Sequence, residues 1–191
     1  AFFDNYAAIS NYIFYTGDSA VMLSSPEYRF CQYDLWNDEK YGEGEKLFAI
    51  QSKHMNPPNL TKMATGEMKG FIEVEKFQSM KKLNIIVSEI KSDNNYYTFH
   101  FNLTNNSAIP IHTNHVSEPQ LIISQNKTEL ADEYLKDITT QQIIENAQSI
   151  SVLVKIAKTK IDVSSAVIIY TKSKENIRGE LIAVRLGSFL K

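Results

Sequence analysis

The chain has 191 residues, of which 43% are hydrophobic and 22% are charged, and its formal net charge is −2. A protein this close to neutrality has no overall field that would attract nucleic acid or an anionic membrane surface. It contains no apolar run of about 18 residues, which argues against a membrane-spanning helix. We therefore expect a soluble globular protein.

The first residues and the cysteine content bear on the compartment. The chain begins Ala1-Phe2-Phe3 without an initiator Met, which fits cleavage by a signal peptidase after a small residue as well as an artificial start. Cys31 is the single cysteine, so no intramolecular disulfide can form, and we interpret it as a small apolar core residue. The hypothesis is an extracytoplasmic location: periplasmic, at the cell surface or secreted.

Aromatic residues divide the chain into two regions, since 12 of the 21 lie within residues 1–48. A segment with Pro57-Pro58 and Gly66 follows them, and consecutive prolines cannot sustain a helix or a central strand. We predict an aromatic-rich α+β region over residues 1–66 and a second domain over residues 67–191.

In the first region, one short amphipathic helix is predicted, with Asp4 in its first turn and Gly17-Asp18 at its end. Its apolar positions are Phe2, Tyr6, Ile9 and Ile13. Strands are expected over Ala20–Leu23 and Tyr28–Trp36, with a polar loop over Asn37–Lys46. Leu47–His54 fits either a strand or a helix.

In the second region, Tyr96–Leu103 shows the clearest pattern, because apolar and polar residues alternate as in a strand with one buried face. The buried set is predicted to be Tyr97, Phe99, Phe101 and Leu103. This orientation argues against a stacking platform for single-stranded nucleic acid. Further strands are expected at Phe71–Phe77, Leu83–Val87, Leu121–Ile123, Ile150–Ile156, Val167–Tyr170 and Leu181–Leu186.

One helix is expected between these strands, with Thr128 as its N-cap. Leu130, Tyr134, Leu135 and Ile138 would share its apolar face. About seven short strands with one short helix favour an antiparallel β-sandwich.

A family resemblance covers residues 83–186. It depends on the alternating strand that ends Phe101-Asn102-Leu103-Thr104-Asn105-Asn106-Ser107, on the turn at 145–149 before the next alternating strand, and on the strand Ala166–Tyr170. These features resemble the immunoglobulin-like domains of bacterial extracytoplasmic lipoproteins and secreted accessory proteins. The resemblance implies an immunoglobulin-like fold and a binding or spacing role, with no catalytic residues to carry over.

Motifs for catalysis and for metal binding are few. The chain has no G-x-S-x-G elbow and no H-E-x-x-H zinc helix, and we predict no catalytic residue and no cofactor. His112 and His115 form a His-x-x-His pair that His100 could complete as a metal site, but exposed polar residues are the favoured interpretation. Carboxylates cluster at Asp38/Glu39 and at Glu129/Asp132/Glu133, where they fit a solvated loop and helix face better than a glycosidase cleft.

The first region offers the stronger functional hypothesis, because tyrosine and tryptophan supply rigid contact area with a polar tip. The candidate binding residues are Tyr12, Tyr15, Tyr28, Tyr33 and Trp36. They form either an internal interface with the second domain or a docking surface for another protein, a glycan or a second copy.

We therefore expect a non-catalytic extracytoplasmic binding or assembly module with a protein partner, a glycan being the other candidate ligand. The alternative is an enzyme acting on a glycan or other small substrate at a cleft between the two regions. A third class is a viral or eukaryotic secreted glycoprotein, which would carry glycans at Asn59 or Asn126. The chain has four N-x-S/T patterns, at Asn59, Asn102, Asn105 and Asn126, where about two would arise by chance.

Overall fold

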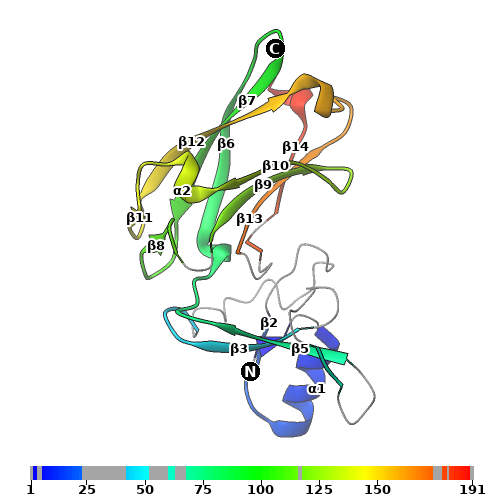
Figure 1. Ribbon diagram of the computed structural model, residues 1–191, viewed down its shortest axis with the longest axis vertical. Helices are drawn as coiled ribbons and strands as arrows, with labels where there is room; N and C mark the ends of the chain where they lie inside the picture. Colours follow the sequence, from blue (N-terminus) through cyan, green and yellow to red (C-terminus); the bar gives the residue numbers. More distant parts are fainter. Residues whose placement is uncertain are drawn as a thin grey trace. The chain divides into compact units, whose positions relative to one another are not determined.

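The computed structural model describes residues 2–3, 6–22, 42–51, 60–62, 68–115, 118–173, 178–179 and 181–189 (Figure 1). The chain forms two compact units, Ala1–Ser79 with Glu175–Arg178, and Met80–Lys174 with Gly179–Lys191. Strands dominate the described residues and most pair antiparallel, so the protein is mainly β, as the sequence predicts.

The first unit contains a five-stranded sheet in the order β2-β1-β3-β5-β4. Its strands are β1 (Phe2–Phe3), β2 (Val21–Met22), β3 (Leu47–Gln51), β4 (Leu60–Lys62) and β5 (Met68–Val74). Because β5 pairs antiparallel with both β3 and β4, it belongs to the first unit. The boundary therefore falls after Ser79 instead of after residue 66, where the proline-rich segment placed it.

One helix, α1 (Tyr6–Thr16), connects the parallel strands β1 and β2. Phe2 was expected in this helix, but Phe2 and Phe3 pair with two strands, and the ladder hydrogen bonds on both sides hold them extended. The helix ends as predicted, since Gly17 has a φ of 72° and its N–H donates to the carbonyl of Ile13. A left-handed residue just after a helix is usually glycine, because glycine has no Cβ to clash.

In the second unit, a three-stranded antiparallel sheet contains β6 (Leu83–Ser92), β7 (Tyr96–Asn105) and β12 (Ser149–Ala157), with β7 in the middle. The predicted alternation of β7 is confirmed, because every second residue from Tyr97 to Asn105 is buried. Strand β12 alternates in the same way, and its buried residues meet those of β7 on one face of the sheet.

Strand β6 contains a bulge between Val87 and Glu89. The inserted residue shifts the alternation, since Leu83 and Ile85 are buried before the bulge and Ile90 is buried after it. Ser88 occupies the bulge, and its hydroxyl donates to the carbonyl of His100 at 3.1 Å.

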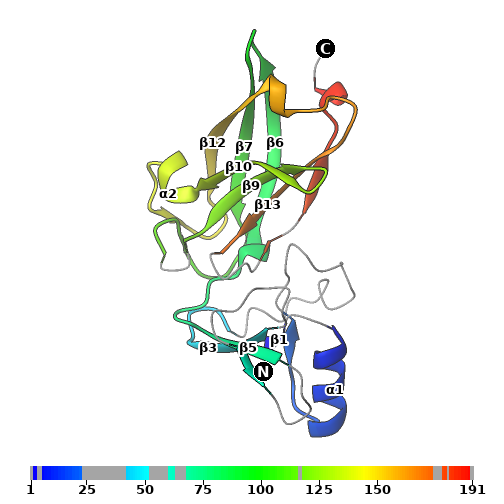
Figure 2. The same cartoon turned by 45° about the vertical axis from the view of Figure 1, so that its right-hand side comes forward.

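A four-stranded antiparallel sheet follows the order β10-β9-β13-β14. Its strands are β9 (Gln120–Gln125), β10 (Thr128–Tyr134), β13 (Val167–Lys172) and β14 (Ile182–Val184). Two shorter strands, β8 (Ile111–His112) and β11 (Ile143–Ile144), pair separately. Figure 2 shows the same elements from a second direction.

The helix predicted from Thr128 is wrong over most of its length. Residues Thr128–Tyr134 form β10, and only Leu135–Ile138 are helical, as α2. The cause is the turn before β10, where Asn126 and Lys127 have φ values of 51° and 67°. Two successive left-handed residues are the signature of a type I′ turn, whose twist matches that of a β-hairpin.

The two larger sheets of the second unit share a single hydrophobic core. Phe99, Phe101 and Leu103 from β7 lie in it together with Leu121 and Ile123 from β9, and all five are fully buried. Burying one such side chain contributes about 1.5–3 kcal/mol, so this core is the main stabilising feature of the unit.

Asn105, the last residue of β7, fixes the connections beside this core. Its fully buried side-chain amide donates to the carbonyls of Ile109 and Ile144 at 2.9 and 2.8 Å, and its side-chain oxygen accepts from the N–H of Ser107 at 2.7 Å. Asn105 begins one of the four N-x-S/T patterns, and in the folded chain its buried side chain is committed to these backbone hydrogen bonds.

Candidate functional site

Helix α1 determines which aromatic side chains of the first unit face solvent. Successive residues of an α-helix are about 100° apart, so Phe14 and Tyr15 lie roughly 140° and 120° away from Ile9, in opposite senses. Ile9 is fully buried among Phe3, Ala20 and Met22. Phe14 and Tyr15 consequently point away from the core of the unit.

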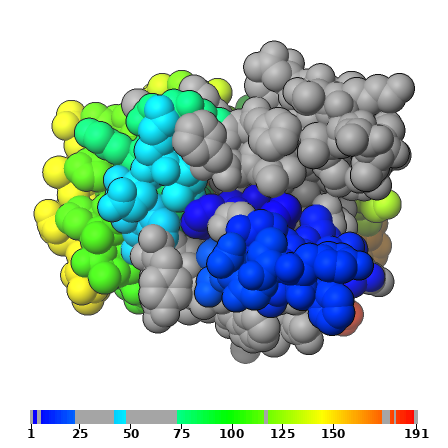
Figure 3. Space-filling view, turned by 90° about the horizontal axis from the view of Figure 1, so that it is seen from below, coloured from blue at the N-terminus to red at the C-terminus, as the bar shows by residue number. Residues whose placement is uncertain are grey.

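These two rings form an exposed aromatic pair. Phe14 and Tyr15 are each 81% exposed, their ring centroids lie 5.2 Å apart, and the ring planes meet at 86°. An edge-to-face contact of this kind holds both rings in a defined arrangement. Figure 3 shows the N-terminal segment, in blue, forming a broad part of the surface on one face.

The candidate residues Tyr12 and Tyr15 have different surroundings. Tyr12 packs against the core of the first unit, with its ring centroid 5.3 Å from that of Phe3, and its hydroxyl donates to Asp18 at 3.3 Å. Tyr15 is exposed. The candidates Tyr28, Tyr33 and Trp36 lie outside the described residues, as do Cys31 and the pair Asp38/Glu39.

Sequence reasoning missed Phe14 as a candidate. It lies one position before Tyr15 and outside the predicted apolar face, which comprises Phe2, Tyr6, Ile9 and Ile13. Its position on the helical wheel could have identified it, because a phenylalanine on the side opposite the buried stripe has no core to fill.

The histidine candidates do not form a metal cluster. His100 lies on β7 beside the bulge, with its Nδ1 3.9 Å from a carboxylate oxygen of Glu89. His112 lies on β8, paired with Ile143, and the N–H of His115 donates to the carbonyl of His112. Across the described ranges, no group of three or more His, Cys, Asp or Glu side chains could hold a metal ion.

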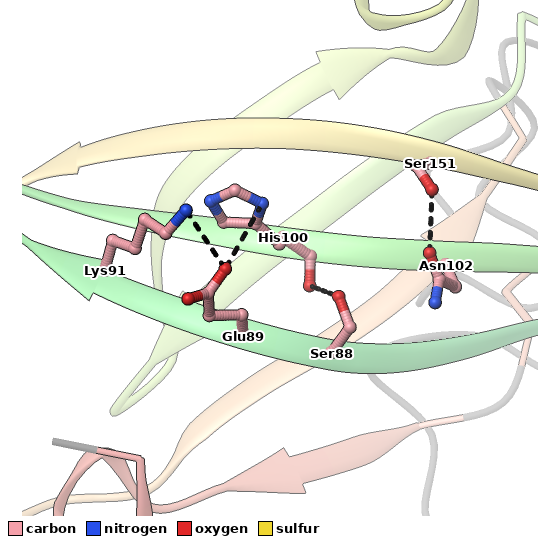
Figure 4. A network of polar contacts seen from close by, with 6 residues as sticks. All are labelled: Ser88, Glu89, Lys91, His100, Asn102 and Ser151. Atoms are coloured by element: carbon pink, nitrogen blue, oxygen red, sulfur yellow. Dashed lines mark hydrogen bonds and ion pairs between the residues drawn. The ribbon is translucent and has the colours of Figure 1, made fainter. Parts of the chain in front are cut away.

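Around His100, polar contacts cover the outer face of the three-stranded sheet (Figure 4). Lys91 lies 3.2 Å from Glu89, and the Ser151 hydroxyl donates to the Asn102 side-chain oxygen at 2.8 Å. Lys91 and Glu89 form an ion pair within β6, whereas Ser151 and Asn102 form a hydrogen bond from β12 to β7, a cross-strand contact that stabilises a sheet.

The carboxylates of β10 meet a lysine. Glu129 and Asp132 lie 3.5 and 3.8 Å from the Lys172 Nζ, whose side chain is mostly buried. Partial burial raises the pKa of Asp132, and the charge of Lys172 opposes that rise. The group belongs to strand β10 instead of the predicted helix face. A glycosidase needs an acid and a base on either side of a sugar, whereas these two carboxylates share one cation.

Of the three other N-x-S/T patterns, Asn126 is exposed in the turn between β9 and β10. Asn102 is partly buried, and Asn59 lies outside the described residues. Within the part of the chain that is described, no helix combines the length and apolar character needed to cross a membrane.

Neither the models of known protein families nor the curated protein sequences give a match to this chain.

Proposed function

We propose that the protein is a non-catalytic binding or assembly module of an extracytoplasmic compartment, which engages a protein partner through Phe14 and Tyr15. The observation that carries this proposal is the exposure of both rings, 81% each, on one helix turn. Large aromatic side chains are mostly buried in folded proteins, and those at the centre of an interface often dominate its affinity. A protein partner would supply the burial that the first unit does not give these rings.

For the second unit, we propose an immunoglobulin-like sandwich, supported by the order of its strands. With the two-residue strands β8 and β11 set aside, seven strands remain among the described residues of this unit. The first, second and fifth form one sheet, and the third, fourth, sixth and seventh form the other. A constant-type immunoglobulin domain has the first, second, fourth and fifth strands in one sheet and the other three in the second. The two arrangements differ only in the sheet that the fourth strand joins.

This fold supports the extracytoplasmic location through the resemblance of residues 83–186 to domains of bacterial lipoproteins and secreted accessory proteins. Domains of that kind serve as binding or spacing modules, which agrees with a surface of paired charges and an exposed aromatic contact. The fold by itself does not determine the function, so the proposal depends on the aromatic pair.

The test replaces both rings and asks whether one specific partner is lost. A photo-crosslinking amino acid at position 14 should capture the partner from the native envelope or secretome, and the same label at the exposed Leu153 serves as the background. The purified partner should then bind Phe14→Ser/Tyr15→Ser roughly 30-fold more weakly, since interface hot spots contribute about 2 kcal/mol or more. Val163→Ser, at a 57% exposed apolar residue of the second unit, is the matched control.

Equal affinity of the double variant and the control would contradict the proposal. Binding to a glycan array that disappears in the double variant would assign the aromatic pair to a sugar ligand instead of a protein. Turnover of any captured glycan would favour the enzyme alternative.

A further inference from the structure

A groove in the second unit lies between the free edges of its two sheets. Strand β6 ends the three-stranded sheet and β14 ends the four-stranded sheet, and no other described strand pairs with the outer side of either. The groove has a volume of about 620 Å³. Its lining includes Ile85, Ile86 and Val87 from β6, Ala183 and Val184 from β14, and Arg185 at the end of β14.

The two sides of the groove offer apolar contacts together with unpaired backbone. Val184 and Ile85 are buried, whereas Ile86 is 52% exposed. On an edge strand, every second residue directs its N–H and C=O away from the sheet, where an added strand can pair with them. Extended peptides bind other proteins in this way, with backbone hydrogen bonds supplying affinity and alternate side chains supplying specificity.

Charge restricts the kind of segment that fits. Arg185 is exposed at the end of β14, and no acidic side chain occurs among the described residues that line the groove. A carboxylate on the incoming segment would meet the guanidinium without competition from the walls. The guanidinium would repel the positive charge of an incoming lysine. The groove should therefore prefer an acidic segment over a basic one.

The bulge in β6 limits the length of the segment. The regular part of β6 ends at Val87, and β14 has only three residues. A three-residue stretch spans roughly 10 Å at about 3.3 Å per residue. Bulges also oppose the pairing of two complete sheet edges, which disfavours a second copy of this chain as the occupant.

We infer that this groove binds a short extended segment of a partner protein by strand addition, with aliphatic side chains at alternate positions and an acidic side chain facing Arg185. The site lies wholly in the second unit and uses none of the residues of the aromatic pair. It would therefore give the protein a second point of attachment.

The test uses a fluorescein-labelled peptide of sequence Val-Thr-Val-Glu-Val-Thr with a blocked C-terminus, and a second peptide with Lys in place of Glu. Fluorescence anisotropy should show that the wild-type protein prefers the Glu peptide. Arg185→Glu should weaken the Glu peptide about fivefold and strengthen the Lys peptide by a similar factor, because attraction becomes repulsion. Lys155→Glu, at an exposed position of β12, changes the net charge equally and should alter neither affinity.

Two further measurements separate strand addition from other kinds of contact. A peptide with proline in place of the central valine lacks one ladder donor and should bind at least tenfold more weakly. Ala183→Trp should fill the groove and abolish binding, since Ala183 is exposed and the larger side chain needs no change in the core. The variant Phe14→Ser/Tyr15→Ser should bind the Glu peptide with the affinity of the wild type. Peptide binding at the groove can therefore be tested even if the aromatic pair proves to bind no partner.

The inference is overturned if the wild type binds neither peptide, if Arg185→Glu and the wild type share the same preference, or if the proline peptide binds equally well. A wild-type dimer in sedimentation velocity that Ala183→Trp dissociates would assign the groove to a second copy and overturn it as well.

Discussion

Two pairs of neighbouring aromatic rings, one in each unit, have opposite surroundings. Phe99 and Phe101 stack in β7 with centroids 6.0 Å apart and are fully buried, whereas Phe14 and Tyr15 touch at 5.2 Å and are almost fully exposed. Residues two apart in a strand share a face that a second sheet can cover. Adjacent residues on the outer side of a lone helix have no such cover. Ring contact alone therefore does not distinguish a buried pair from an exposed one, whereas the position of the rings relative to the packed face of their strand or helix does.

The largest effect on stability is expected at the buried pair Phe99 and Phe101. Phe101→Ala should lower the free energy of unfolding of the second unit by about 3–5 kcal/mol, because it removes a fully buried ring and leaves a cavity. Urea unfolding followed by circular dichroism measures this loss. Tyr96→Ala, on the exposed side of the same strand, is the control, and a similar loss at both positions would contradict the burial argument.

The next largest effect on stability is expected at the buried side-chain amide of Asn105, the last residue of β7. Asn105→Ala should cost about 2–4 kcal/mol, since it removes the hydrogen bonds to the carbonyls of Ile109 and Ile144 and the one from the N–H of Ser107. The adjacent Asn106→Ala, at an exposed side chain, should change the same urea midpoint little. If both variants unfold at the wild-type midpoint, the amide does not hold the loop.

A smaller effect on stability is expected at Asp93, and it should depend on pH. Hydrogen bonds from the backbone N–H groups of Asn95 and Tyr96 hold the pKa of Asp93 below its ordinary value. A lowered folded-state pKa means that the contribution to stability is fully present above the ordinary value of 3.8 and is lost as the pH falls through the folded-state pKa.

The difference in urea midpoint between the wild type and Asp93→Ala should therefore be larger at pH 7 than at pH 2.5. Asp137→Asn, at another exposed aspartate, controls for the change in charge. A difference that stays constant between the two pH values would show that the carboxylate charge is not what holds this turn.

The smallest effect on stability is expected at the exposed pair. Phe14→Ser/Tyr15→Ser should change the free energy of unfolding of the first unit by no more than about 0.5 kcal/mol, as is usual for surface substitutions. Hydrogen exchange of the α1 amides checks this locally. Faster exchange throughout α1 would mean that the pair stabilises the helix and is not kept for binding.

The long strands of the second unit could be predicted from sequence because their alternation is undisturbed from end to end, as in β7 and β12. Strand β10 could not, because Leu130 and Tyr134 fit helical spacing and the turn before it has lysine where glycine is the usual signal. The bulge in β6 was also missed, since one inserted residue leaves an apolar pattern that can be read in either register.

The candidate site was only partly predictable. Tyr15 was identified from its type and region, but Tyr12 was grouped with it although the two face opposite environments. Burial of a single ring depends on which side of α1 packs on the sheet. That side is defined by contacts with β1 and β2, and these two-residue strands are too short for an alternation of apolar and polar residues to predict them. The histidines show the same limit, because β7 places His100 beside Glu89 across a strand pair that spacing does not reveal.

The bulge at Ser88 has a consequence for the protein in concentrated solution. A ten-residue edge strand with a free outer side would be a template for endless association between molecules if it were flat and regular. The bulge breaks the ladder near its middle, so no incoming strand can run its full length. Deletion of Ser88 would remove that interruption. We expect the shortened protein to aggregate before any change in its fold can be detected.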